Sequence, residues 1–178
     1  SPETPFDALL LAECAQEAGI PAGVINVITA DREEGARLVA SKGVDKVSFT
    51  GSTAAGKAIA RACLDRMARF TLELGGKSAA ILLDDIDLGA ALGSLAPFTM
   101  PFSGQICFAQ TRILAPRRRL AEIVDACAGA MSGLNVGDPW REQTHLGPLS
   151  SASQRARVMS YIDRGRAEGA RLVTGGGA

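Results

Sequence analysis

Three short stretches of the sequence hold residue types that could do chemistry. In chain order they are a glycine-containing turn at 49–57, a carboxylate block at 72–78 and a cysteine at the end of 102–107. We expect Cys107 in a loop, where an ionised thiol can attack an electrophile. Most cysteines in apolar surroundings are inert filling, so the neighbouring residues alone leave both interpretations open.

A carboxylate is the second reactive group. Glu73 stands between two leucines at the end of a predicted strand, and Gly75 and Gly76 follow it. We expect this position to withdraw the carboxylate partly from water, which would suit a general base. The alternative interpretation is a surface glutamate beside a turn.

The stretch 49–57 joins a predicted strand to a predicted helix. Its glycines permit a tight turn, and the first amides of the helix point outward, so the turn can hold a phosphate. It nearly matches the phosphate-binding loop of nucleotide hydrolases, but Ala58 occupies the position whose hydroxyl would hold magnesium. It also lacks the glycine fingerprint of ordinary dinucleotide folds. The local pattern leaves an anion site and plain helix capping equally open.

Taken in order, these stretches resemble the NAD(P)-dependent aldehyde dehydrogenase superfamily. The matching segments are the turn at 49–56, the glutamate block at 73–78 and the loop at 104–107. Weaker matches extend the resemblance over essentially the whole chain, at 17–21, 23–27, 135–139, 147–148 and 168–170. In the light of this resemblance, the near match to a phosphate-binding loop becomes a coincidence.

The resemblance implies an oxidoreductase that converts an aldehyde to a carboxylic acid with NAD or NADP. Cys107 would be the nucleophile, passing through a thiohemiacetal and a thioester, and Glu73 would activate the water that hydrolyses the thioester. The backbone amide of Cys107 would be one hydrogen-bond donor to the oxyanion. The alternative is a non-catalytic member that serves structure or binding. Such a member would be expected to have lost the cysteine or the glutamate.

The resemblance also assigns binding residues. The cofactor contacts carry over to Thr50, Gly51, Ser52, Thr53, Gly56 and Leu74. The aldehyde pocket is expected to include Phe102, Gln105, Ile106 and Phe108, with core packing an equal alternative for Phe108. NAD is favoured, but NADP stays open. Pro2 stands where many members have a glutamate for the adenosine ribose, and the loop at 29–32 lacks the usual glycines.

Short apolar strands alternate with amphipathic helices, which predicts an α/β fold with a parallel sheet covered on both faces. Expected strands span 25–28, 46–49, 70–74, 79–83, 111–114 and 171–173. Expected helices span 5–18 with Thr4 as its cap, 33–41, 53–67 and 151–168, and two more include 88–95 and 120–131. The acidic run at 84–87 is predicted to cap a helix rather than hold a metal. The resemblance divides the chain into the C-terminal part of a Rossmann-like NAD(P)-binding domain, 1–75, and the N-terminal part of an α/β catalytic domain, 76–178.

Composition limits the classes of partner. Nineteen basic residues balance nineteen acidic ones, so no net charge draws the chain to nucleic acid or to an anionic membrane. No apolar run has the length of a membrane span. His145 is the one histidine, so no metal site is expected. Cys14, Cys63 and Cys127 are expected to be apolar filling, and a cytoplasmic location follows because nothing suggests a disulfide framework.

The two ends of the sequence favour a fragment of a longer protein. The chain begins in a predicted loop without a methionine and stops in a glycine run. The resemblance implies a parent that is a homodimer or homotetramer acting on a small-molecule aldehyde. It also places a second oxyanion donor and part of the cofactor cleft outside these residues. We therefore expect the chain alone to turn over aldehyde poorly.

Overall fold

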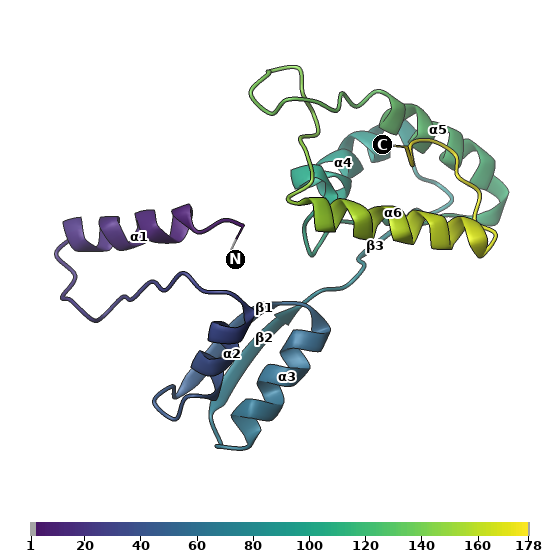
Figure 1. Ribbon diagram of the computed structural model, residues 1–178. Helices are drawn as coiled ribbons and strands as arrows, with labels where there is room; N and C mark the ends of the chain where they lie inside the picture. The colour runs from purple at the N-terminus through teal and green to yellow at the C-terminus, as the bar shows by residue number, and fades with distance from the viewer. Residues whose placement is uncertain (1–2, 178) are drawn as a thin grey trace. The chain divides into compact units, whose positions relative to one another are not determined.

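Two compact units make up the chain. The computed structural model describes residues 3–177, without the side chains of residues 96 and 97 (Figure 1). The units span Ser1–Gly75 and Gly76–Ala178. The first holds α1 (Phe6–Glu17), α2 (Arg32–Ala40), β1 (Lys46–Gly51), α3 (Thr53–Leu64) and β2 (Arg69–Leu74). The second holds β3 (Ala79–Ile81), α4 (Leu88–Thr99), the 3-10 turn η1 (Pro101–Gly104), β4 (Arg112–Leu114), the 3-10 turn η2 (Arg117–Arg119), α5 (Leu120–Ser132) and α6 (Ala152–Ala167).

A parallel strand pair with a helical crossover forms the first unit. The register runs from Lys46 opposite Arg69 to Gly51 opposite Leu74, and α3 packs against both strands. Parallel neighbours need a crossover connection, and a helix is the usual one. Cys63 on α3 is fully buried. The alternation of helices with parallel strands confirms the predicted α/β class.

One side chain that follows α3 binds both α2 and the segment after it. The Arg66 guanidinium donates hydrogen bonds to the carbonyl oxygens of Val39 and Val44. Met67 then adopts the left-handed conformation, with φ +57°. Because a residue in this conformation cannot continue a right-handed helix, α3 ends at Leu64, before the expected end at Met67.

The second unit repeats the parallel pairing on a smaller scale. Ala79 lies opposite Arg112 and Ile81 opposite Leu114, with α4 between the two strands in sequence. The helix α4 packs against α5. Asp87 accepts a hydrogen bond from the Ala90 amide at 2.9 Å, so the predicted capping role of the acidic run is confirmed. The buried residues of this unit are Ala80, Leu82, Ala91, Thr99, Ala109 and Ile123.

Two expected strands are absent from the described residues. The segments 25–28 and 171–173 are irregular, and their apolar side chains are exposed, Ile28 to 68% and Val173 to 48%. A strand needs a neighbour to satisfy its backbone groups, and neither segment has one in the described part of the chain. The apolar pattern of these segments was therefore insufficient to predict a strand.

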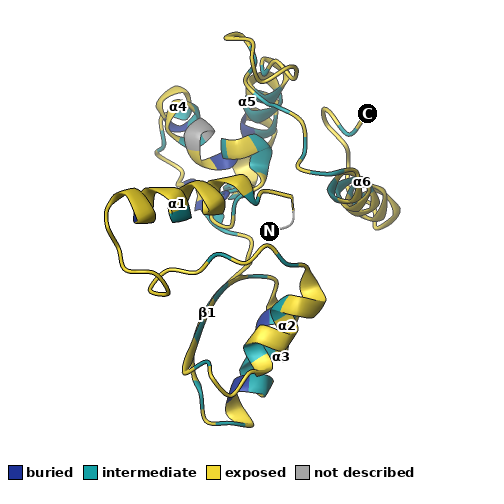
Figure 2. Cartoon of the chain, turned by 60° about the vertical axis from the view of Figure 1, so that its left-hand side comes forward, coloured by how far each residue is buried: buried dark blue, intermediate teal, exposed yellow. Residues whose placement is uncertain are grey.

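Two other expectations for the first unit were wrong. Pro5, not Thr4, is the N-cap of α1, and no side chain caps this helix. The sheet is covered on one face instead of two. Half-buried residues alternate with exposed ones along β1 (Figure 2). The strand β2 is mostly exposed. The reason is that one helix, α3, packs on both strands of a two-stranded sheet.

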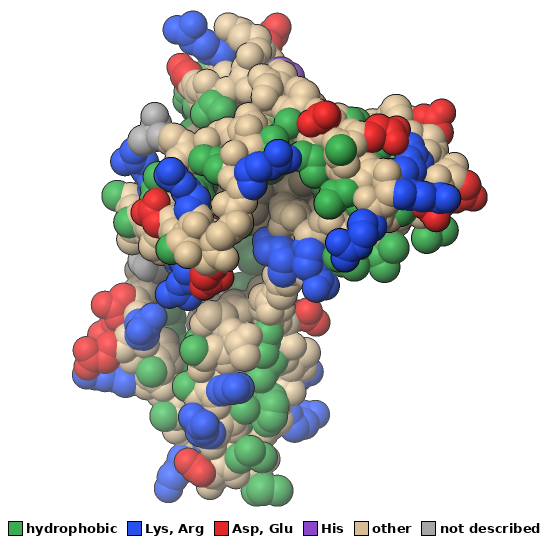
Figure 3. Space-filling view, turned by 90° about the vertical axis from the view of Figure 1, so that its right-hand side faces the viewer, with side chains coloured by type: hydrophobic (Ala, Val, Ile, Leu, Met, Phe, Trp, Pro, Cys, Tyr) green, Lys and Arg blue, Asp and Glu red, His purple; other side chains and the backbone are tan. Residues whose placement is uncertain are grey.

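Exposed hydrophobic side chains are common on both units. Figure 3 shows them among acidic and basic side chains on the visible face. The first unit's α1 is almost wholly exposed, including Phe6 at 79%. Among the helices of the described residues, none is both long and apolar enough to cross a membrane.

Candidate active site

The strand-end site comprises residues 50–56 with Glu73 and Leu74, at the carboxyl ends of β1 and β2. The strand β1 ends at Gly51, and Ser52 is the N-cap of α3. Its Oγ accepts a hydrogen bond from the Ala55 amide at 3.2 Å. The amides that precede Ala55 in the first turn have no acceptor within the helix and carry the positive end of its dipole. Helix capping and anion binding are thus compatible at this turn, because the capped helix still has free amides that can bind an anion.

Two glycines of this site lie in close contact with neighbouring side chains. A Cβ at Gly56, which is buried, would lie 2.6 Å from Cδ2 of Leu74. A Cβ at Gly51 would lie 2.5 Å from Cζ of Phe49. Side chains at these distances would overlap. Gly56 therefore lets the start of α3 lie against the end of β2, whereas Gly51 leaves room for the Phe49 ring within β1.

The register brings the candidate base to the same sheet edge. Glu73 lies opposite Thr50, and Leu74 lies opposite Gly51. The amide of Gly75 donates to the carbonyl oxygen of Gly51 at 3.2 Å, which extends the pairing beyond the strands. Partners in register share a face, so Thr50 and Glu73 lie on the face opposite Leu74.

Glu73 is exposed in this chain, so the expected partial withdrawal from water was wrong for the described residues. Side chains alternate between the two faces of a strand. The neighbouring leucines therefore point away from Glu73, and Leu74 packs against α3 at Gly56. The flanking leucines in the sequence did not indicate the environment of the carboxylate itself.

The second candidate region is the cysteine loop, residues 101–107. Its turn η1 holds Phe102 and Ser103 in the left-handed region, with φ +50° and +58°. Gly104 continues the same conformation with φ +74°. The thiol of Cys107 is exposed, as expected for a loop position. Glu73 belongs to the first unit and Cys107 to the second.

Hydrogen bonds fix the cysteine loop on both sides. The Gln105 amide donates to the Phe102 carbonyl oxygen at 3.1 Å, closing the left-handed turn. After the cysteine, the Gln110 amide donates to the Phe98 carbonyl oxygen at 2.9 Å. Ala109, between them, is 1% exposed. Cys107 therefore lies in an exposed stretch between two anchored points.

The proposed aldehyde-pocket residues lie along this one loop. Phe102 is 76% exposed and Phe108 48%, whereas Ile106 is half-buried and Gln105 is exposed. Sequence reasoning missed Ser103, whose hydroxyl donates to the carbonyl oxygen of Gly147 at 3.1 Å. A serine flanked by phenylalanine and glycine gives no sign of a partner that lies so far along the chain.

The remaining cysteines differ in environment. Cys63 is buried, as expected of filling. Burial also raises the pKa of the Cys127 thiol, which keeps it protonated. Cys14 is exposed, so the expectation of filling was wrong in this chain, because α1 itself is exposed. Groups of three or more potential metal ligands are absent from the described residues.

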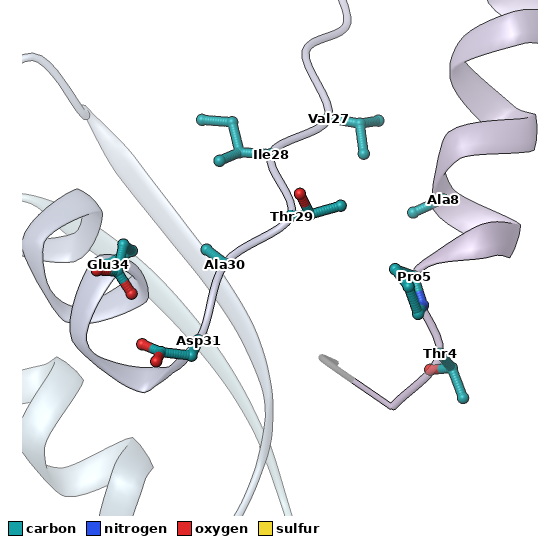
Figure 4. A pocket seen from close by; sticks show the side chains of 9 residues that line it. All are labelled: Thr4, Pro5, Ala8, Val27, Ile28, Thr29, Ala30, Asp31 and Glu34. Atoms are coloured by element: carbon teal, nitrogen blue, oxygen red, sulfur yellow. The ribbon is translucent and has the colours of Figure 1, made fainter.

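A pocket of about 410 Å³ lies in the first unit. Figure 4 shows Pro5 and Ala8 at the α1 side and the segment 27–31 facing them. Two carboxylates, Asp31 and Glu34, also line it. A hydrogen bond shared with the Glu34 carboxyl group, together with one donated by the Glu33 amide, holds the pKa of Asp31 below its usual value. Asp31 therefore stays ionised at neutral pH.

Comparison with known proteins gives a consistent family match. The aldehyde dehydrogenase family model matches residues 1–178. A geranial dehydrogenase from Castellaniella defragrans is 53% identical over 174 residues, which cover 98% of this chain and 36% of the relative. Betaine aldehyde dehydrogenase 1 from Rhizobium meliloti is 45% identical over 177 residues, which cover 99% and 36%.

Solved structures match equally well. A Mycobacterium tuberculosis aldehyde dehydrogenase complexed with NAD+ superposes with a TM-score of 0.96 at 46% identity, over 98% of this chain and 36% of that one. A mutant aldehyde dehydrogenase C from Pseudomonas syringae, in complex with NAD+ and octanal, gives a TM-score of 0.94 at 39% identity, with the same coverage. The chain spans about 36% of the length of these relatives.

Proposed function

Because this chain belongs to the aldehyde dehydrogenase family, we propose that it supplies the nucleophile and the general base of an NAD(P)-dependent oxidation of an aldehyde to a carboxylic acid. One observation supports this proposal most. The register and the glycine contacts bring Glu73, Thr50 and the start of α3 to one sheet edge, where ligands of α/β folds bind. The family's alternative, a member without catalysis, is not favoured because both Cys107 and Glu73 are present.

Cys107 is proposed to begin the reaction. Its thiolate attacks the aldehyde carbon, and the developing negative charge on oxygen takes a hydrogen bond from the Cys107 backbone amide. A bound nicotinamide cofactor would supply the hydride acceptor for the thiohemiacetal that forms on Cys107. The thioester that remains on Cys107 is hydrolysed by water, from which Glu73 takes the proton. An exposed Glu73 and an exposed Cys107 both have the access to solvent that these steps require.

The strand-end site fits the phosphates of a dinucleotide. Gly56 has no side chain at a point where even a Cβ would meet Leu74, and the capped start of α3 offers free amides. Amides at a helix start bind anions through direct hydrogen bonds and the helix dipole. We propose that Gly51, Ser52 and Thr53 hold the phosphates, that Gly56 contributes to the cofactor site by letting the start of α3 lie close to β2, and that Thr50 and Leu74 lie toward the nicotinamide.

NAD is proposed as the cofactor in preference to NADP. We assign the adenosine side to the pocket at 27–31, whose wall carries Asp31 and Glu34. Carboxylates suit ribose hydroxyls and repel the additional phosphate of NADP. Changing Asp31→Asn should raise the ratio of NADP to NAD affinity by about fivefold, which corresponds to about 1 kcal/mol. Titration of the protein with NAD and with NADP would measure this ratio, and Glu13→Gln on α1 is the control. An unchanged ratio in Asp31→Asn would refute the assignment of the adenosine side to this pocket.

An apolar aldehyde is the proposed substrate class. Phe102 and Phe108 are exposed, Ile106 is half-buried, and all three lie within five residues of Cys107 in the sequence. The geranial dehydrogenase relative and the octanal complex favour this class, whereas the betaine aldehyde relatives favour a charged one. Kinetics of the whole protein with aliphatic, aromatic and amino aldehydes would decide between them. We also propose a cytoplasmic homodimer or homotetramer for the whole protein.

The decisive experiment uses Cys107 and Glu73 together. In the whole protein, Cys107→Ser should abolish NADH formation, whereas Glu73→Gln should still release NADH once and then accumulate the acyl thioester, detectable by intact mass. If both variants lost the NADH of the first turnover equally, the separate roles of Cys107 as nucleophile and Glu73 as general base would be refuted. This chain alone should give little NADH, so robust turnover by it would show that further segments are dispensable.

A nucleotide hydrolase would behave differently. It would bind ATP with magnesium, yet Ala58 lacks the hydroxyl that holds the metal in such enzymes. A thermal shift with ATP but none with NAD would favour that class over the proposed one.

A further inference from the structure

The residues that precede Cys107 adopt a backbone conformation that L-amino acids rarely take. Phe102 has φ +50° and ψ +43°, and Ser103 has φ +58° and ψ +33°. Each non-glycine residue in this region is destabilised by about 1–2 kcal/mol. Two such residues in succession persist only where surrounding contacts hold them. The cysteine loop must therefore have contacts that fix this turn.

Two side chains of the loop bind one distant segment. Ser103 Oγ donates to the carbonyl oxygen of Gly147 at 3.1 Å. The amide of Ser150 donates to Oε1 of Gln105 at 3.0 Å. The segment 147–150 thus accepts a hydrogen bond from Ser103 and donates one to Gln105. Two bonds from neighbouring residues constrain the turn more than either bond alone.

The segment 147–150 is itself anchored at both ends. Before it, Val136 and Leu146 form a parallel β-bridge, and the Gly137 amide donates to the Leu146 carbonyl oxygen at 3.0 Å. After it, Ser151 is the N-cap of α6 and accepts a hydrogen bond from the Gln154 amide. The loop is consequently attached to a segment that has its own backbone supports.

We propose that the segment 147–150 is a clamp that holds the left-handed turn, and that Ser103 is a positioning residue for Cys107. The carboxamide of Gln105 completes the connection, since its Nε2 donates to the Phe102 carbonyl oxygen at 3.3 Å while its Oε1 binds the clamp. Without the Ser103 hydroxyl, the turn relaxes and the Cys107 amide loses its fixed direction. The inference rests on the proposed function, in which that amide binds the oxyanion.

Two reagents separate the direction of the amide from the exposure of the thiol. With p-nitrophenyl acetate, the thiolate attacks the carbonyl carbon, an acetyl thioester forms, and p-nitrophenolate leaves with the bonding electron pair. An oxyanion develops in this reaction. With iodoacetamide, the thiolate displaces iodide and no oxyanion develops. The ratio of the two rates at Cys107, measured by peptide mass spectrometry on the 178-residue chain, therefore reports the oxyanion donor. Exposed Cys14 provides the reference ratio.

Ser103→Ala should lower the acylation-to-alkylation ratio at Cys107 by about tenfold, less than the hundredfold or more that complete loss of an oxyanion donor causes. Ser103→Asn should retain most of the ratio, because asparagine tolerates the left-handed region and its amide can donate. Ser160→Ala is the matched control. It removes a serine-to-carbonyl bond of 2.8 Å to Arg157 in α6, and the ratio should not change.

Each outcome decides the proposal. An unchanged ratio in Ser103→Ala overturns the clamp but leaves Cys107 as the nucleophile. If the acylation-to-alkylation ratio at Cys107 in the unaltered chain is no higher than that at Cys14, both the clamp and the role of Cys107 as nucleophile are overturned. Alkylation of buried Cys63 would reveal that the Ser103→Ala chain has unfolded. In that case the Ser103→Asn chain decides. A retained acylation-to-alkylation ratio in it supports the clamp, and a lost ratio overturns the clamp.

Discussion

The strand-end site and the cysteine loop reach defined backbone geometry by opposite means. The first lies on regular structure, where the parallel register of β1 and β2 and the cap of α3 place its residues. The second leaves regular structure for a left-handed turn that depends on contacts more than 40 residues away, at Gly147 and Ser150. A substitution at the strand-end site should act through local packing and capping. A substitution in the cysteine loop should act through a hydrogen bond to a distant segment.

The largest expected effect tests the packing side of this comparison. Gly56→Ala should lower the free energy of unfolding of the first unit by about 1–2 kcal/mol, because the added Cβ would meet Cδ2 of Leu74 at 2.6 Å and displace that side chain. Gly35→Ala in α2 has open space around its Cβ and should raise it by about 0.5–1 kcal/mol. Denaturant titration followed by circular dichroism would measure both. Equal effects would mean that close packing does not define the strand-end site.

The next effect separates strain from bonding in the cysteine loop. Ser103→Ala keeps the left-handed strain and loses a hydrogen bond, so it should destabilise the second unit by about 1 kcal/mol. Ser103→Gly loses the same bond but removes strain of about 1 kcal/mol, so the net change should be near zero. Thermal unfolding of the two variants gives the difference directly. If glycine were as damaging as alanine, the turn would be unstrained.

An effect of similar size concerns the cap of α3. Ser52→Ala removes the acceptor of the Ala55 amide and should destabilise the first unit by about 1 kcal/mol. Ser48→Ala on the exposed face of β1 should change stability by less than about 0.5 kcal/mol. Urea titration of both variants would measure the two changes. Matching values would remove the cap from the features that hold the strand-end site.

The smallest effect is a pH dependence in the second unit. The Arg119 guanidinium holds the pKa of Glu122 below its usual value, with the two side chains 2.8 Å apart. A carboxyl whose pKa is lower in the folded state stabilises the fold above its unfolded pKa and loses this contribution as pH falls through the folded pKa. Glu122→Gln should therefore flatten the acid limb of the unfolding midpoint against pH. Both side chains reach solvent, so the change is small, and parallel acid limbs would contradict it.

Sequence reasoning succeeded where a feature depends on residues close together in the chain and failed where it depends on distant ones. Asp87 was correctly expected at a helix start, since capping depends on residues two or three positions apart. The segments 25–28 and 171–173 were wrongly expected as strands, since a strand exists only with a neighbour. Glu73 was wrongly expected to be withdrawn from water, because its leucine neighbours point to the other face.

By itself the sequence determined the family resemblance, the α/β class and the order of the glycine turn, Glu73 and Cys107. These follow from residue types and local periodicity, which the linear chain contains. Only the tertiary structure decided that Gly56 must accommodate Leu74 and that Ser103 must reach Gly147. The physical reason is that these contacts join residues distant in sequence, and no local rule of backbone or side-chain preference specifies which distant atoms will meet.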